Sequence, residues 1–227
     1  MKVIKRISCA LAMIGASLSG SALADSYIFG NSEFNTSNGI NITATSGDFF
    51  VPISNSGSWN SKNFTHAGGA NYIVGDCIVD CGLSDHINFN NYFIFDLSSI
   101  SGTILSASLN LYSYTVSKDS LEYLLFDVTS PLSDVHAIGP NAAVYNDLMS
   151  GISYGSFVYN TTDSNLFRSI TLNSAGINAL NSAVGGEFGI GGTTISPVPE
   201  PETYAMLLTG LGLLGFMARR KRNSSLN

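Results

Sequence analysis

The clearest periodic pattern in the chain lies at residues 103–112, TILSASLNLY. If this stretch is extended, one face carries the apolar residues Leu105, Ala107, Leu109 and Leu111. The opposite face carries Ser106, Ser108 and Asn110. Alternation with a period of two predicts a half-buried β-strand. The apolar phase then shifts to Tyr112, Tyr114 and Val116, which predicts a bulge or a twist near Ser113.

Other short stretches have the composition of strands. They are residues 26–30, 48–54, 91–97, 120–128, 155–160, 166–172 and 187–195. Turn-forming residues separate them, at 37–39, 56–57, 67–69, 98–102 and 117–120. Many short strands with such spacing predict an all-β fold, an antiparallel β-sandwich or jelly roll over residues 25–196.

One short helix is expected within this domain, in the segment NSAGINALNSAVGG. Ser174 is a suitable N-cap, and Ile177, Leu180 and Val184 lie near one face of a helix. Gly185 stands where a left-handed residue commonly ends a helix.

The first 24 residues have the pattern of a secretory signal peptide. Lys2, Lys5 and Arg6 precede an apolar run that ends in Ala22-Leu23-Ala24, a small-x-small cleavage site. We expect cleavage between Ala24 and Asp25. The alternative is an N-terminal membrane anchor, but Ser and Gly interrupt the apolar run.

A second apolar segment, residues 203–218, carries no charge and is followed by Arg219, Arg220, Lys221 and Arg222. Sixteen helical residues span about 24 Å, slightly less than the roughly 30 Å core of a bilayer. A buried core helix is the alternative, but the basic cluster directly after the segment favours a transmembrane helix. Positive flanks stay in the cytoplasm, so we expect an exported domain outside and the basic cluster inside.

The charge between the two apolar segments is strongly negative. Residues 25–196 hold three cations (Lys62, Lys118 and Arg168) against 14 acids, a net charge of −11. A field of this sign repels phosphate backbones, so we expect no nucleic-acid partner.

Two cysteines remain after the expected cleavage, Cys77 and Cys81 in GDCIVDCG. In an oxidising compartment they are expected to form a small structural disulfide. Free thiols or half of a zinc site are the alternatives, although no His stands at zinc-finger spacing.

Candidate catalytic and binding residues are few. His66, His86 and His136 lie outside catalytic motifs. His86 ends the acidic stretch GDCIVDCGLSDH, for which a calcium site and a solvated loop are both open interpretations. Asp96 and Asp127 share an aromatic-Asp-aliphatic pattern, which fits either an acid/base pair or carboxylates that cap turns. Trp59 and the tyrosines suit either a sugar-stacking platform or the core.

The segment VPEPETYAMLLTGLGLLGFMARRKR, residues 198–222, resembles the PEP-CTERM sorting signal of Gram-negative bacteria. Its matching parts are the Pro199-Glu200-Pro201 motif, the apolar span and the basic cluster 219–222. The resemblance implies recognition by an exosortase, a membrane-embedded cysteine transpeptidase, and processing near the motif. It also implies an association with exopolysaccharide, biofilm and floc production. The central domain is similar to β-sandwich domains found before such tails.

Together these features predict a signal peptide (1–24), a β-sandwich domain (25–196) and a sorting signal (197–222). We expect a non-enzymatic protein of the cell surface or matrix, structural or adhesive, without catalytic residues, metal or cofactor. Its expected partners are the exosortase, the inner membrane before processing, and extracellular polysaccharide. A carbohydrate-binding module is the first alternative, and a polysaccharide hydrolase or lyase using Asp96, Asp127 or His86 is the second.

Overall fold

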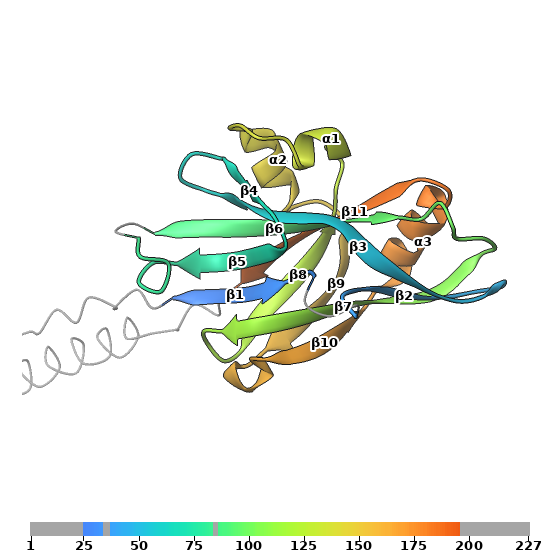
Figure 1. The fold of residues 1–227 in the computed structure, drawn as a ribbon, viewed down its shortest axis with the longest axis horizontal. Coiled ribbons are helices and arrows are strands. Elements are labelled where there is room, and N and C mark those ends of the chain that lie inside the picture. The colour runs from blue at the N-terminus through green and yellow to red at the C-terminus, as the bar shows by residue number, and fades with distance from the viewer. Residues whose placement is uncertain (1–24, 34–36, 84–85, 196–227) are drawn as a thin grey trace, which may run out of the picture.

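The computed structural model describes residues 25–33, 37–83 and 86–195 (Figure 1). The strands within these residues are β1 (Ser26–Asn31), β2 (Gly39–Ala44), β3 (Gly47–Asn60), β4 (His66–Gly68), β5 (Asn71–Cys77), β6 (Ile87–Asp96), β7 (Ile104–Val116), β8 (Leu121–Asp127), β9 (Ser153–Tyr159), β10 (Leu166–Thr171) and β11 (Glu187–Ile195). The helices are α1 (Leu132–Val135), α2 (Ala142–Asp147), the 3-10 turn η1 (Thr161–Asp163) and α3 (Ser174–Ala183).

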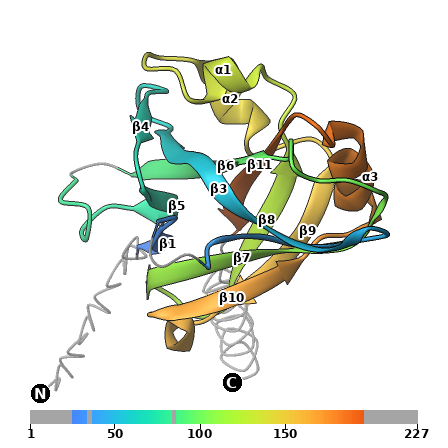
Figure 2. The ribbon, with the colours of Figure 1, turned by 45° about the vertical axis from the view of Figure 1, so that its right-hand side comes forward.

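All strand pairs in the described residues are antiparallel, so the prediction of an antiparallel all-β domain is confirmed. One short helix was predicted, and α1, α2 and η1 are present in addition to it. In place of the two separate sheets of a sandwich, hydrogen bonds link the strands in one curved sheet (Figure 2). Six strands close into a barrel in the order β3-β2-β7-β1-β5-β6 and back to β3. Strands β11, β8 and β9 extend the sheet from β6, β10 pairs with β7, and β4 pairs with β3.

Strands β1 and β2 pair with successive parts of β7. Ile28 lies opposite Val116, and Gly39 lies opposite Asn110. Between the part of β7 that pairs with β1 and the part that pairs with β2, the backbone ladder is interrupted. Buried polar side chains supply the missing hydrogen bonds there. The amide oxygen of Asn38 accepts from the backbone N–H of Tyr112 at 2.7 Å, for example. Such pairing meets the requirement that buried backbone donors find acceptors.

The sheet encloses the larger of two hydrophobic clusters. Side chains from nearly every strand meet there, and Leu180 of α3 is fully buried against them. The second cluster lies on the outer face of β3 and β6, where Trp59, Tyr92 and Ile94 pack against α1 and α2. Strand β6 is therefore buried on both faces, which explains its continuous apolar run NYFIF.

The predicted alternation in β7 is correct except at its first residue. Ala107, Leu109 and Leu111 are buried, but Leu105 is 60% exposed. The register between β2 and β7 shifts between Thr43 and Ala44, and this irregularity turns Ile104 into the core instead. The predicted irregularity near Ser113 is present, because the pairing with β1 shifts there.

The expected short helix is α3, but it begins one residue earlier than predicted. Asn173, rather than Ser174, is the N-cap, and its side-chain oxygen accepts from the N–H groups of Ala175 and Gly176 at 2.9 and 3.1 Å. Gly185 has φ +85°, the left-handed conformation expected after the helix.

Within residues 25–33, 37–83 and 86–195, no helix is long and apolar enough to cross a membrane. Several predicted segments lie outside the described residues. They are the signal peptide up to and including Ala24, the Pro199–Pro201 motif, the span 203–218 and the basic cluster 219–222.

Candidate functional site

The two carboxylates with a shared sequence pattern are not brought together. Asp96 ends β6 and Asp127 ends β8, and their partners on β11 are Glu187 and Ile190, three residues apart. This register puts the two backbones about 14 Å apart, whereas glycosidase carboxyl groups lie between about 5 and 9.5 Å apart.

Each of these aspartates is held by its own loop. Asp96 accepts from the backbone N–H of Ser98 at 2.9 Å, and hydrogen bonding by the side chain and the backbone of Ser98 lowers the pKa of its carboxyl group. Asp127 accepts from the N–H of Ile152 at 2.6 Å and lies directly against Gly151, which has φ +103°. Both carboxylates therefore stabilise the turns beside them. This agrees with the interpretation of Asp96 and Asp127 as carboxylates that cap turns.

Trp59 does not form a sugar-stacking platform. Its side chain is fully buried, and its indole N–H donates to the carbonyl oxygen of Val135 at 2.8 Å. Eight of the nine tyrosines in the described residues are buried as well: Tyr27, Tyr72, Tyr92, Tyr112, Tyr123, Tyr145, Tyr154 and Tyr159. The interpretation of these aromatic residues as core is therefore the correct one.

Cys77 and Cys81 form a disulfide with a Cα–Cα distance of 5.8 Å. The loop between them is capped by Asp25, whose carboxylate accepts from the N–H groups of Ile78 and Asp80 at 2.6 and 2.9 Å. Burial opposes ionisation of Asp25, but these backbone hydrogen bonds outweigh it and lower the pKa of the carboxyl group. The first residue after the expected signal cleavage is thus part of the folded loop.

The acidic residues near this loop have protein partners. The imidazole of His86 lies 3.8 Å from the carboxylate of Asp76, and both side chains are exposed. Asp80 accepts from the hydroxyl of Tyr27 at 2.9 Å. Burial, together with this hydrogen bond, raises the pKa of Tyr27 to about 12. In the part of the chain that the structure describes, no group of three or more His, Cys, Asp or Glu side chains is arranged to hold a metal ion.

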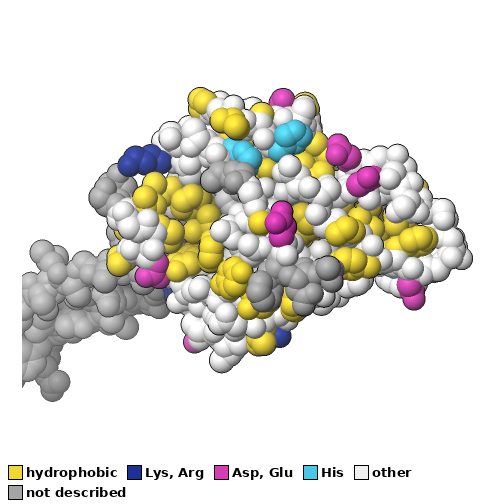
Figure 3. Space-filling view, in the orientation of Figure 1, with side chains coloured by type: hydrophobic (Ala, Val, Ile, Leu, Met, Phe, Trp, Pro, Cys, Tyr) yellow, Lys and Arg dark blue, Asp and Glu magenta, His cyan; other side chains and the backbone are white. Residues whose placement is uncertain are grey.

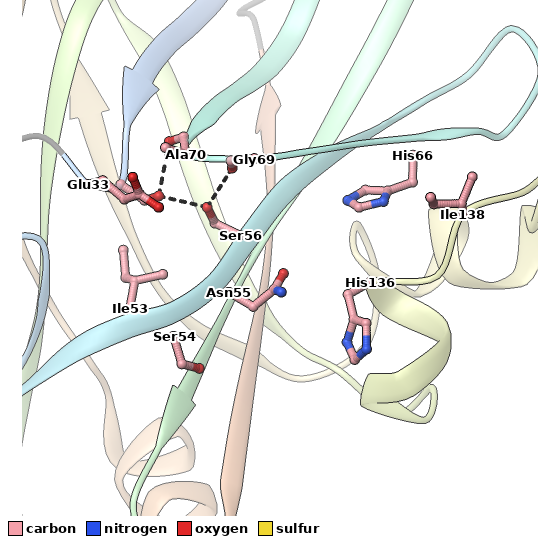
Figure 4. A pocket seen from close by; sticks show the side chains of 11 residues that line it. Glu33, Ile53, Ser54, Asn55, Ser56, His66, Gly69, Ala70, His136 and Ile138 are labelled. Carbon is pink, nitrogen blue, oxygen red and sulfur yellow. Dashed lines mark hydrogen bonds between the residues drawn. The ribbon is translucent and has the colours of Figure 1, made fainter.

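A cleft of about 460 Å³ lies elsewhere, next to the interruption in the sheet. One wall comes from β3 and the neighbouring turns, and the other comes from His66 of β4 and the loop after α1 (Figure 4). The residues that line it are Ser32, Glu33, Ile53, Ser54, Asn55, Ser56, His66, Gly69, Ala70, His136 and Ile138. Its volume is within the range of ligand pockets, roughly 300 to 1,000 Å³.

Hydroxyl groups stabilise the wall on the side of β3. The hydroxyl oxygens of Ser32 and Ser56 lie 2.7 Å apart, and they lie 3.0 and 3.1 Å from the carbonyl oxygens of Ala70 and Gly69 (Figure 4). The two hydroxyl protons make two of these three hydrogen bonds at a time: one serine donates to the other, or each donates to its carbonyl. These bonds join the residue after β1 to β3 and to the turn that precedes β5. The wall on this side is therefore held by hydrogen bonds within the protein.

A hydrogen-bonded chain fixes the imidazole of His66. The hydroxyl of Tyr92 donates to the amide oxygen of Asn55 at 3.0 Å, and His66 Nε2 lies 2.8 Å from the same hydroxyl. Because the single hydroxyl proton is engaged, Nε2 carries the ring proton of the neutral imidazole. Nδ1 is then an acceptor, and it is buried without a hydrogen-bond partner in the structure.

The electrostatics of the cleft keep His66 neutral. Burial lowers the pKa of its imidazole, and the nearby His136 lowers it further when that ring is charged. Figure 4 shows the two rings on the same side of the cleft, with Asn55 between His136 and Ser56. Figure 3 shows histidine side chains on this face, in the region where Figure 1 places α1, α2 and β4.

The chemistry of the lining suits hydroxyl-bearing ligands. Its polar groups are hydroxyls, an amide, two imidazoles and the carboxylate of Glu33, and no Lys or Arg is among the lining residues that the structure describes. Such a lining accepts and donates hydrogen bonds but provides no permanent positive charge for an anion.

Sequence reasoning did not find this cleft. It treated His66 and His136 as isolated histidines, because they are 70 residues apart in the chain and share no motif. The signal that could have indicated it is the polar stretch SNS at 54–56 within an otherwise apolar-patterned strand.

A comparison with family models matches residues 197–222 to the PEP-CTERM protein-sorting motif. The comparisons with curated proteins and with solved structures give no match. The resemblance stated from Pro199-Glu200-Pro201, the apolar span and the basic cluster is thereby confirmed. C-terminal to its β-structured domain, the chain carries a PEP-CTERM protein-sorting motif.

Proposed function

We propose that this is an exported protein with a structural or adhesive role in an exopolysaccharide or biofilm layer, and that it has no enzymatic activity of its own. The observation that carries the proposal is the motif match at residues 197–222, which implies processing by an exosortase and export to the cell surface. Cleavage after Ala24, and a cytoplasmic location of Arg219–Arg222 before processing, are parts of the same proposal.

Features of the described domain support export. The Cys77–Cys81 disulfide is of the kind that persists in oxidising compartments. Asp25 is integrated into the fold by its bonds to the disulfide loop, whereas the residues before it belong to the signal-peptide pattern. The large excess of acids keeps such a domain soluble outside the membrane.

The test is the intact mass of the protein from surface and medium fractions of its host, with and without the exosortase. We expect a mass that lacks residues 1–24 and everything after the Pro199–Pro201 region. This mass should appear only in the strain that contains the exosortase. A chain that keeps the apolar segment and the basic cluster in both strains would contradict the proposal. Additional mass on the processed form would show glycosylation.

A carbohydrate-binding role is the second candidate, and the cleft beside His66 favours it. A saccharide hydroxyl can donate to the carboxylate of Glu33 and accept from the amide of Asn55, which both line the cleft and are exposed. The exposed aromatic platform that the sequence suggested is not part of this proposal, because Trp59 is buried.

Calorimetric titration of the processed protein with neutral oligosaccharides from the host's own polymer tests this role. We expect His136→Ala to weaken binding at least ten-fold. His86→Ala, which removes an exposed imidazole that is not part of the cleft lining, should leave binding unchanged. Equal affinities in the two variants would exclude the cleft as the binding site.

A further inference from the structure

The connection between the domain and the sorting motif is short. Strand β11 ends at Ile195, and Pro199 follows four residues later. A chain spans at most 3.6 Å per residue, so Pro199 lies within about 14 Å of Ile195, and Thr203 lies within about 29 Å. A domain of this length has a radius of gyration of about 15 Å, so the motif cannot reach around it to the far end.

The barrel end to which the motif is attached is identified by the contacts of β11. Ile195 lies opposite Glu122 at the start of β8. A Cβ on Gly75 would lie 2.6 Å from the hydroxyl oxygen of Thr194, so the end of β11 packs against the end of β5. Strand β5 leads directly into the disulfide loop, residues 78–83. The turn at 117–120 is at the same end, because Ser117 and Tyr27 exchange hydrogen bonds.

The disulfide loop is cross-linked and hydrogen-bonded, and it presents an apolar side chain to solvent. Besides the disulfide and the bonds to Asp25, the N–H of Leu83 donates to the carbonyl of Ile78 at 2.8 Å. Val79 at the tip of the loop is nevertheless 74% exposed, and Ile195 is 51% exposed. The loop therefore holds an aliphatic group in a fixed position without burying it.

The charges at this end favour a protein partner over lipid. Asp25, Asp76, Asp80 and Glu122 lie on or beside the loop and the end of β11, and the turn at 117–120 adds Lys118 and Asp119, so the net charge stays negative. An anionic bilayer surface repels such a cluster. Of the two surfaces that the short connection brings near this end, the bilayer and the enzyme that cuts the motif, the charge favours the enzyme.

We propose that the disulfide-loop end of the barrel, formed by residues 78–83 with Val79 at its tip, is the surface that contacts the exosortase during processing. This inference rests on processing by the exosortase, which is part of the proposed function. Because the connection is short, an enzyme that acts on Pro199–Pro201 works within about 14 Å of the end of β11, and Val79 provides an apolar contact at this end.

The experiment measures the rate at which full-length chain is converted to the processed form in cells that contain the exosortase. Val79→Glu is compared with Leu105→Glu, which changes a similarly exposed aliphatic residue at the opposite end of the barrel. Each variant is made with the natural connection and with a Gly-Ser insert of about 12 residues after Ile195. Protease resistance of each variant confirms that the domain is folded.

With the natural connection we expect Val79→Glu to slow conversion roughly ten-fold, the size expected when a Val contact is replaced by a carboxylate. Leu105→Glu should convert at the wild-type rate, and the insert should remove the difference between the two. Equal rates with the natural connection would overturn the inference, and so would a Val79→Glu defect that persists with the insert. If no chain is converted at all, including wild type, it is the proposed function that fails.

A lipid contact would give a different result. The processed wild-type protein would then sediment with phosphatidylglycerol vesicles, and Val79→Glu would not. That outcome would assign the surface to the membrane and overturn its assignment to the exosortase.

Discussion

Trp59 is the residue that ties the helical loop region to the sheet. It is fully buried in the outer cluster, and its N–H satisfies the carbonyl of Val135 at 2.8 Å. We predict that Trp59→Ala lowers the free energy of unfolding by about 3 to 5 kcal/mol, because it leaves a large cavity and an unpaired carbonyl. Urea unfolding of the processed protein measures this.

Val79→Ala serves as the matched control, because Val79 is largely exposed and should change stability by no more than about 0.5 kcal/mol. A similar small loss in Trp59→Ala would mean that the outer cluster does not contribute to the cooperative fold.

His66 provides a test of the cleft geometry. Burial and the neighbouring His136 both lower the pKa of its imidazole. We predict that His136→Gln raises the pKa of His66 partway toward 6.5, since the repulsion is removed and the burial remains. Titration of the imidazole signals by NMR measures the shift. His86→Gln should leave the pKa of His66 unchanged, and an equal rise in both variants would contradict the pairing.

The sign of the accompanying stability effect follows from the direction of this shift. The folded state prefers neutral His66, so its contribution to stability is present above the ordinary pKa of 6.5 and is lost as the pH falls through the folded pKa. In His66→Gln the loss of stability over this pH range should be smaller than in wild type.

At the scale of elements, the N-cap of α3 is the most specific test. Asn173 accepts from two N–H groups of the first turn and donates to the carbonyl of Ser153 at 2.8 Å. We predict that Asn173→Ala costs about 1 to 2 kcal/mol of stability, and that Asn173→Ser recovers part of it. Asn178→Ala, on the exposed face of the same helix, should be neutral in thermal unfolding. Equal melting temperatures for both alanine variants would be the contradicting result.

Some strands could be predicted from their local sequence pattern, whereas others depend on tertiary pairing with neighbouring strands. The strong alternation of β7 and the long apolar run of β6 predicted those strands well. Strands β2, β4 and β5 were not predicted, because Gly and Asn dilute their patterns and pairing with neighbouring strands decides their conformation. Helices α1 and α2 are four and six residues long, too short for a helical period to be visible.

At the scale of the whole molecule, the pairing joins distant parts of the chain. Strand β1 pairs with β5 and β7, and β11 pairs with β6 and β8. We predict that the processed protein unfolds in one cooperative transition, with the fluorescence of Trp59 and the far-ultraviolet circular dichroism coinciding along a urea series. An earlier fluorescence transition would show that the outer cluster under α1 and α2 opens independently of the barrel.

The sequence by itself determined the β class, the helix α3 with its terminal glycine, and the sorting motif at 197–222, because each depends on residues that are neighbours in the chain. Period, capping and an ordered motif are local properties. The tertiary structure alone decided that six strands close into a barrel, that Asp96 and Asp127 stay apart, and that Trp59 is core. It also decided that His66 and His136 share a cleft, because these relations depend on strand register and loop packing between residues far apart in the chain.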